Sequence, residues 1–267
     1  MSRTVRRFLT AVMVLVLGAA LAACGGRSHG PSGPIAAHFR HHDFGDRAPH
    51  AWGRNAPWTY GVHGIDVSRW QGDIDWPRVR RAGVSFAFLK ATEGGDVADP
   101  MFRQNWDAAA RAGVARGAYH FYYFCRTPEE QAAWFIAHVP RQPGSLPPVL
   151  DMEWTISRNC PGRPAPAVVR DHATRFMNAL ERHYGQRPVF YTTPEFYEEN
   201  DLGRLRAEFW LRSVAGHPSE RYPNEQWTFW QWTGTGIVPG VRGDTDINAF
   251  KGSAGAYRNW LARRMVR

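Results

Sequence analysis

Residues 85–124 read SFAFLKATEGGDVADPMFRQNWDAAARAGVARGAYHFYYF, and their pattern indicates the architecture of the chain. Apolar runs at Ser85–Ala91 and Ala115–Phe124 are typical of buried strands. Between them, apolar residues recur at three- and four-residue spacing and stop before Gly113, which predicts a helix that ends at this glycine. The apolar positions of that helix are Phe102, Trp106 and Ala109. A strand, a helix and a second strand in this order predict parallel strands joined by a right-handed crossover.

The same alternation continues on both sides of this stretch. Thr127-Pro128-Glu129-Glu130 has the pattern of a capping box that starts one helix, and another helical pattern runs from Val169 to Tyr184 and stops at Gly185. Eight runs have the composition of strands: Gly64–Val67, Ser85–Ala91, Ala115–Phe124, Pro148–Glu153, Pro188–Thr192, Glu208–Val214, Trp227–Trp232 and Thr245–Phe250. Eight strands in such an order predict a closed barrel.

The last third of the chain departs from a regular barrel. The connections after Val214 and after Trp232 are each 12 residues long, contain Pro and Gly, and lack helical periodicity. A parallel crossover needs about a dozen residues and usually contains a helix. We therefore expect an α/β fold, an irregular TIM-like β/α barrel with eight strands and fewer than eight helices, in which some of the final strands are antiparallel.

The first 24 residues have the features of an export signal. A basic start is followed by a short apolar stretch that ends in Leu21-Ala22-Ala23-Cys24. This ending resembles the bacterial lipobox, in which the cysteine receives lipid and becomes the mature N-terminus; an ordinary signal peptide with a nearby cysteine is the alternative. We expect residues 1–24 to be a lipoprotein signal peptide with lipidation at Cys24. The protein would then be exported and held at a membrane by its lipid, in the periplasm, at the outer membrane or at the cell surface.

Residues 25–60 are rich in Gly, Pro, His and Ser and show no sustained periodicity. This composition is typical of a flexible tether, here between the lipid and a domain over residues 61–267. The histidines of this segment have no preorganised geometry, so we interpret them as part of a solvated linker. No His-x-x-x-His motif or Cys/His cluster lies in the domain, and we expect neither a metal nor a cofactor.

The charge distribution argues against nucleic acid as a partner. The net charge is +9, and residues 1–60 carry seven Arg and two Asp, which is +5, so residues 61–267 carry only +4. No basic run occurs in the domain, whereas a nucleic-acid interface needs Lys and Arg clustered on one face. A modest positive excess is compatible with weak attraction to an anionic polymer such as a cell wall.

Two cysteines remain after Cys24. An oxidising compartment favours a disulfide between Cys125 and Cys160, since both follow strands that should end on the same face of the fold. Two buried free thiols are the alternative.

Four acidic residues lie on or at the ends of the predicted strands. Asp151 and Glu153 are two apart on one strand, so both point to the same face, roughly 6–7 Å apart by strand rise. Asp66 lies on the first strand and Asp246 on the last, and these strands are neighbours in a closed barrel. Two carboxyl groups in a partly desolvated cavity provide a proton donor and an anion, which glycosidic cleavage requires.

Aromatic residues gather in the same zone of the predicted barrel. Sugar rings present apolar faces that aromatic side chains can cover. We expect about half of this set to be ordinary core, and strand alternation allows only one face of Trp230-Gln231-Trp232 to point inward. The set comprises Tyr119, Phe121, Tyr122, Tyr123, Tyr191, Trp230 and Trp232.

Together these stretches resemble glycoside hydrolase family 25, the Chalaropsis-type lysozymes. The resemblance runs in family order from about Gly61 to Phe250, and the ordered set is far more specific than any one motif. The sixth strand departs from the family pattern, because it reads Phe209-Trp210-Leu211-Arg212 where an aliphatic-aromatic run with a small residue is more usual. The matching stretches are GIDVSRWQG (64–72), FLKATEG (88–94), GAYHF (117–121), LDME (150–153), Tyr191-Thr192, WQWT (230–233) and GDTDINAF (243–250).

The resemblance implies a muramidase, or lysozyme, that hydrolyses the β-1,4 bond between N-acetylmuramic acid and N-acetylglucosamine of peptidoglycan with net retention, acting as a monomer. It implies Glu153 as the general acid and Asp151, Asp66 and Asp246 as further active-site carboxylates. It also implies Lys90, Tyr191 and Trp230 as residues close to the bound glycan.

Several alternatives stay open at this point. A carboxylate could attack the anomeric carbon directly, or the substrate's own N-acetyl group could do so while Asp151 orients it; the Asp-x-Glu spacing favours the second route. A barrel that binds glycan without turnover, or a hydrolase of a related polymer such as chitin, are the competing functions. Loss of a carboxylate would favour the binding module, and all four are present.

Overall fold

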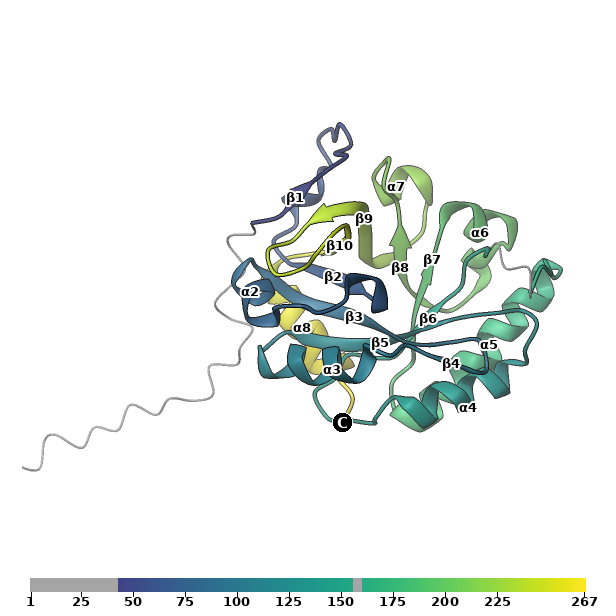
Figure 1. Ribbon diagram of the computed structural model, residues 1–267. Helices are drawn as coiled ribbons and strands as arrows, with labels where there is room; N and C mark the ends of the chain where they lie inside the picture. Colours follow the sequence, from purple (N-terminus) through teal and green to yellow (C-terminus); the bar gives the residue numbers. More distant parts are fainter. Residues whose placement is uncertain (1–42, 156–159) are drawn as a thin grey trace, which may run out of the picture. The chain divides into compact units, whose positions relative to one another are not determined.

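The computed structural model describes residues 43–155 and 160–267, and in these residues eight strands close into a barrel (Figure 1). Each of the eight predicted runs overlaps one of these strands, so the predicted barrel is confirmed. The strands are β2 (His63–Val67), β3 (Val84–Glu93), β5 (Ala115–Phe121), β6 (Val149–Asp151), β7 (Val189–Thr192), β8 (Glu208–Arg212), β9 (Trp227–Ile237) and β10 (Thr245–Phe250).

Within the barrel, strand direction changes only at the last strand. All neighbours from β2 through β3, β5, β6, β7 and β8 to β9 are parallel, whereas β10 is antiparallel to both β9 and β2 and closes the barrel between them. The antiparallel strand follows the connection after Trp232, which contains no helix, whereas the connection after Val214, expected to lack one, contains the short helix α7 (Pro218–Arg221) and joins two parallel strands. A further two-residue strand, β4 (Val97–Ala98), pairs with the end of β3.

Seven α-helices lie in the described part of the chain, as expected for an irregular barrel with fewer than eight. The predicted capping box starts α4, because the Thr127 hydroxyl accepts from the Glu130 amide while the Glu130 side chain accepts from the Thr127 amide. Three short 3-10 helices, η1 (Pro57–Thr59), η2 (Arg69–Gln71) and η3 (Leu202–Arg204), complete the set. The α-helices are α2 (Trp76–Arg81), α3 (Phe102–Arg111), α4 (Pro128–His138), α5 (Pro166–Tyr184), α6 (Pro194–Glu199), α7 (Pro218–Arg221) and α8 (Ala254–Arg264).

Aromatic rings fill the barrel interior at the amino ends of the parallel strands. Phe88 stacks on Trp210 with 4.6 Å between ring centroids, and both rings are fully buried. Glycine makes room for this packing, since a Cβ at Gly64 would lie 2.3 Å from the ring of Phe86. Helix α8 closes this end, where its Tyr257 packs near Phe86. Because this aromatic core occupies the amino ends of the parallel strands, the polar side chains that face the inside of the barrel lie towards the carboxyl ends of those strands.

The domain begins earlier in the chain than the sequence predicted. Residues 43–60, which we placed in a flexible tether, pack on the outside of the barrel. Here β1 (Gly45–Asp46) pairs with β9, and Trp52 contacts the ring of Trp230 edge-on at 5.1 Å. Indole burial and strand pairing offset the cost of ordering a segment rich in Gly and Pro. The ordered domain therefore begins before residue 61.

Candidate active site

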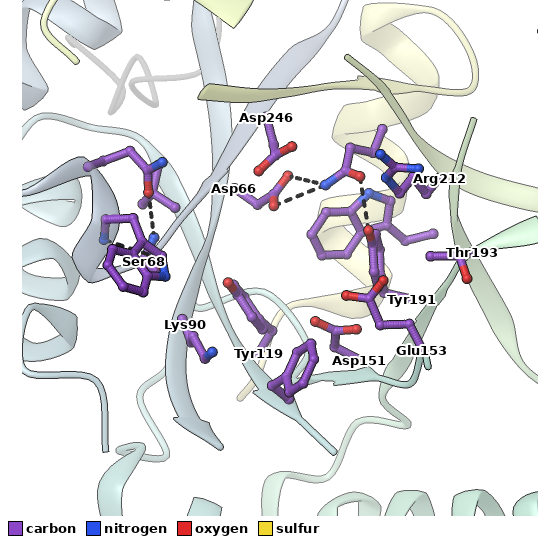
Figure 2. Close-up of a pocket in the computed structure, with 16 residues that line it drawn as sticks. Asp66, Ser68, Lys90, Tyr119, Asp151, Glu153, Tyr191, Thr193, Arg212 and Asp246 are labelled. Carbon is purple, nitrogen blue, oxygen red and sulfur yellow. Dashed lines mark hydrogen bonds between the residues drawn. The ribbon is translucent and has the colours of Figure 1, made fainter. Parts of the chain in front are cut away.

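A cavity of about 430 Å³ opens at the carboxyl ends of the barrel strands, and all four predicted acidic residues line it (Figure 2). Its volume lies within the range typical of small-molecule sites. Parallel strands of a barrel bring their carboxyl ends to one mouth, so residues distant in sequence converge there. The acids are Asp66, Asp151, Glu153 and Asp246.

Asp66 is the most firmly held of these carboxylates. It lies opposite Asp246 in the antiparallel pairing of β2 and β10 and is only 7% exposed. Both of its oxygens accept from Nε2 of Gln231 at 3.1 Å, and Oδ1 also accepts from Nδ2 of Asn248 at 2.7 Å. Three hydrogen bonds from two amides fix the position of the Asp66 carboxylate.

The two amides are themselves held in one orientation. The Tyr191 hydroxyl donates to Oε1 of Gln231 at 2.9 Å, and Nε1 of Trp210 donates to Oδ1 of Asn248 at 2.7 Å. Each amide oxygen is thereby occupied by a donor, which leaves the N–H groups to face Asp66. The indole of Trp210 and the phenol of Tyr191 therefore position Asp66 through an intermediate residue.

Asp151 and Glu153 differ in their surroundings although they are two residues apart. Asp151 ends β6 and is 6% exposed, and its Oδ1 has no hydrogen-bond partner among the described residues. Glu153 follows the strand, is partly exposed, and lines the cavity at its edge. A buried carboxylate oxygen without a donor is costly unless a ligand supplies one or the group is protonated.

Burial is the largest cause of a raised pKa at each of the four carboxyl groups. The charge of Asp246 adds to the rise at Asp66, and the charge of Glu153 adds to the rise in the pKa of Asp151. The pKa of Asp246 reaches about 6. The cation of Arg212 opposes the rise in pKa at Glu153 and at Asp246. The cavity therefore retains protons on carboxyl groups at a pH where exposed carboxyl groups have lost them.

Two cations flank the acids. Lys90, a predicted site residue, lines the cavity, lies 4.8 Å above the ring of Phe121, and donates to Glu93 at 2.5 Å. Arg212 lines the cavity from the end of β8. The sequence marked Arg212 only as a departure from the family pattern, so its place in the site was not predicted.

Tyr191 lies in the cavity as predicted, whereas Trp230 does not. In β9, Phe229 and Gln231 face the barrel interior, so strand alternation turns Trp230 to the outside. There Trp230 is fully buried, and its Nε1 donates to the Ser213 carbonyl at 2.8 Å. Trp230 therefore does not line the cavity, which corrects its predicted position beside the glycan.

Two other indoles line the cavity in its place. One is Trp210, and the other is Trp70 of η2, which is 77% exposed on the rim. Trp70 lies in the matching stretch GIDVSRWQG and Trp210 in the predicted strand Glu208–Val214, but neither indole was predicted as a site residue. Tyr119 and Phe121 of the predicted aromatic set also line the cavity, whereas Tyr122 is buried in the outer core.

The remaining predicted site residues are the cysteines. Cys125 and Cys160 form a disulfide with a Cα–Cα distance of 5.5 Å. Cys24 lies outside the described residues. Among residues 43–155 and 160–267, no group of three or more His, Cys, Asp and Glu side chains is arranged to hold a metal ion.

Comparison with known proteins agrees with this geometry. The model of the family described as "Glycosyl hydrolases family 25" matches residues 65–241. Lysozyme M1 of Streptomyces globisporus is 38% identical over 213 residues, which cover 73% of this chain and 70% of the relative. An Escherichia coli (strain K12) relative, "Uncharacterized protein YegX", is 34% identical over 220 residues, 79% of this chain and 78% of the relative.

A solved structure shares the fold. The family 25 glycosyl hydrolase from Bacillus anthracis superposes with a TM-score of 0.72 at 34% sequence identity, covering 80% of this chain and 98% of that structure. The barrel, the four acids at its mouth and these matches agree, and the chain belongs to glycosyl hydrolase family 25.

Proposed function

We propose that the protein is a lysozyme that hydrolyses the β-1,4 bond between N-acetylmuramic acid and N-acetylglucosamine of peptidoglycan, with net retention at the anomeric carbon. The observation that carries the mechanism is the buried, unpartnered Oδ1 of Asp151 beside Glu153. An N–H donor on the substrate would satisfy this oxygen, and the acetamido group of an N-acetylated sugar provides one.

In the first step Glu153 is the general acid. Its raised pKa keeps a proton on the carboxyl group, and the proton passes to the glycosidic oxygen as the bond to the anomeric carbon breaks. The acetamido carbonyl oxygen attacks the anomeric carbon from the opposite face and closes a five-membered cationic ring. Asp151 accepts the acetamido N–H and stabilises the positive charge that develops there.

In the second step water opens this ring. The Glu153 carboxylate takes one proton from the water, the water oxygen bonds to the anomeric carbon, and the acetamido group is restored. Two inversions give net retention, and Glu153 ends protonated as it began. Asp66 and Asp246 lie on the opposite wall, where they hydrogen-bond the sugar and stabilise developing positive charge.

Three measurements test the proposal. Digestion of purified peptidoglycan should release muramic acid reducing ends; glucosamine ends would identify a glucosaminidase, and no release would identify a glycan-binding barrel. NMR of the first product should show the β-anomer. Replacing the N-acetyl group by N-trifluoroacetyl should lower kcat strongly, because the nucleophile is weakened. An unchanged kcat would instead assign the attack to a carboxylate.

Membrane attachment is a separate part of the proposal. No helix in residues 43–155 and 160–267 is long and apolar enough to cross a membrane. We propose that the lipidated Cys24 anchors the exported enzyme and that residues from 25 to the ordered domain form the tether. Cys24→Ser should move the protein from the membrane fraction to the soluble fraction, and an unchanged distribution would exclude the lipid anchor.

A further inference from the structure

A second pocket of about 250 Å³ adjoins the catalytic cavity and shares three of its wall residues. The shared residues are Glu153, Thr193 and Arg212. Figure 2 shows Thr193 on the side of Glu153 away from Lys90, and Arg212 above Glu153. The connection after β6, the start of α6 and the connection after β8 form the walls of the second pocket. A group attached to a sugar in the catalytic cavity can therefore enter this pocket without leaving the protein surface.

Two guanidinium groups give the pocket its charge. Arg212 lines it where it meets the catalytic cavity, and Arg221, from the end of α7, lines it further out. Both lie close enough to Tyr222 to lower the pKa of its hydroxyl group, against the larger effect of burial. Among the described residues, neither guanidinium makes a hydrogen bond or an ion pair, although many other arginines of the chain do. The donors of Arg212 and Arg221 are thus available to a ligand.

The acidic side chains that line the second pocket do not cancel the positive charge of its two arginines. Glu195 of α6 is an exposed wall residue, and Glu153 carries a proton in its role as general acid. Five N–H donors in a planar fork suit a carboxylate, which they can hold through two parallel hydrogen bonds. Glu195 can at the same time accept an N–H of the same ligand.

We propose that Arg212 and Arg221 form a binding site for a carboxylate carried by the muramic acid unit of the substrate. This inference rests on the proposed muramidase function. Muramic acid differs from glucosamine by its lactyl group, which bears a free carboxylate in peptide-free glycan and an acidic peptide in peptide-bearing glycan. Either carboxylate is carried on C3 of the same sugar ring whose C1–oxygen bond Glu153 protonates, and the pocket would make the enzyme selective for muramic acid over neutral N-acetylglucosamine polymers.

The test compares charged and neutral substrates. The full chain is assayed on peptide-free glycan, on peptide-bearing glycan, and on each of these after amidation of its carboxylates, and the quantity measured is the ratio of kcat/KM for the charged and amidated forms. Arg212→Gln and Arg221→Gln should each lower this ratio by about 10-fold, which corresponds to about 1.4 kcal/mol. A fall confined to peptide-free glycan identifies the lactyl carboxylate, and a fall confined to peptide-bearing glycan identifies the peptide.

The ratio separates this contact from other effects of the arginines. Arg212 also lowers the pKa of Glu153, but that change affects charged and amidated substrates alike. Arg81→Gln is the matched control, because Arg81 is an exposed arginine at the opposite, amino end of the barrel strands. An unchanged ratio in both arginine variants, or an equal fall in Arg81→Gln, would overturn the carboxylate site. Failure of the wild type to cleave any of these glycans would instead overturn the proposed function.

Discussion

Asp246→Asn should make the protein more stable at neutral and alkaline pH, because the active site destabilises the fold when its carboxyl groups ionise. Asp246 faces Asp66 across the β2–β10 pairing, and its pKa rises from 3.8 to about 6, chiefly through burial. A raised pKa means that the folded state favours the protonated form. Protonation of Asp246 therefore stabilises the folded state. This stabilisation is fully present below the unfolded pKa of 3.8 and is lost as the pH rises through the folded pKa of about 6.

The size of the effect follows from the same values. A rise from 3.8 to about 6 corresponds to about 3 kcal/mol at pH 8. Water in the open cavity screens part of this cost, so we expect a gain of about 1–2 kcal/mol for Asp246→Asn at pH 8. The gain should shrink as the pH falls towards 4 and should vanish only below the unfolded pKa of 3.8, where Asp246 is protonated in both states.

Urea denaturation from pH 4 to pH 8 measures this difference directly. Asp96→Asn is the matched control: Asp96 is exposed and paired with Arg126, so its loss should bring no gain in stability. A pH-independent difference between wild type and Asp246→Asn, or a loss of stability at pH 8, would refute the reasoning.

Four further outcomes are expected. Glu153→Gln should lower kcat by about 10²–10⁴-fold with an unchanged circular dichroism spectrum, because it removes the proton donor. Wild-type kcat/KM should fall as the pH rises through the raised pKa of Glu153, and Arg212→Ala should move that fall to higher pH because the opposing cation is gone. Trp70→Ala should raise KM roughly 3- to 10-fold through the loss of an exposed sugar platform, as measured in glycan titrations. Replacing both Cys125 and Cys160 by Ser should lower the free energy of unfolding by at most about 4 kcal/mol, as judged from the 35-residue separation, in denaturant titrations under oxidising conditions.

The barrel and the meeting of its four acidic residues could be predicted, because both follow from the spacing of apolar residues along the chain and from the closure of the strands into a ring. Apolar runs of strand length alternate with helical spacing, and a closed ring of strands must bring the first and the last strand together. Asp66 and Asp246 were therefore expected to meet, and the register pairs them directly. Asp151 and Glu153 share a strand end, so their proximity required no tertiary information.

The residues that hold these acids required the register of distant strands. Gln231 and Asn248 donate to Asp66 only because the register of β9, β10 and β2 places the three side chains next to one another. Nothing in the sequence around either amide indicates that it donates to an active-site carboxylate. Arg212 lies in a run that departs from the family pattern, but its neighbours could not be predicted without the fold of the connection after β8.

The two corrections, Trp230 and the segment 43–60, have one physical cause. Once Gln231 is known to donate to Asp66, the alternation of β9 is decided, and Trp230 and Trp232 must lie on the outside of the barrel. Two indoles on an outer face are costly to leave in water, at about 25 cal/mol for each Å² of apolar surface. Residues 43–60 cover them, with Trp52 against Trp230 and β1 along β9. The composition of this segment predicted a tether because its order comes from the surface it covers and not from any periodicity of its own.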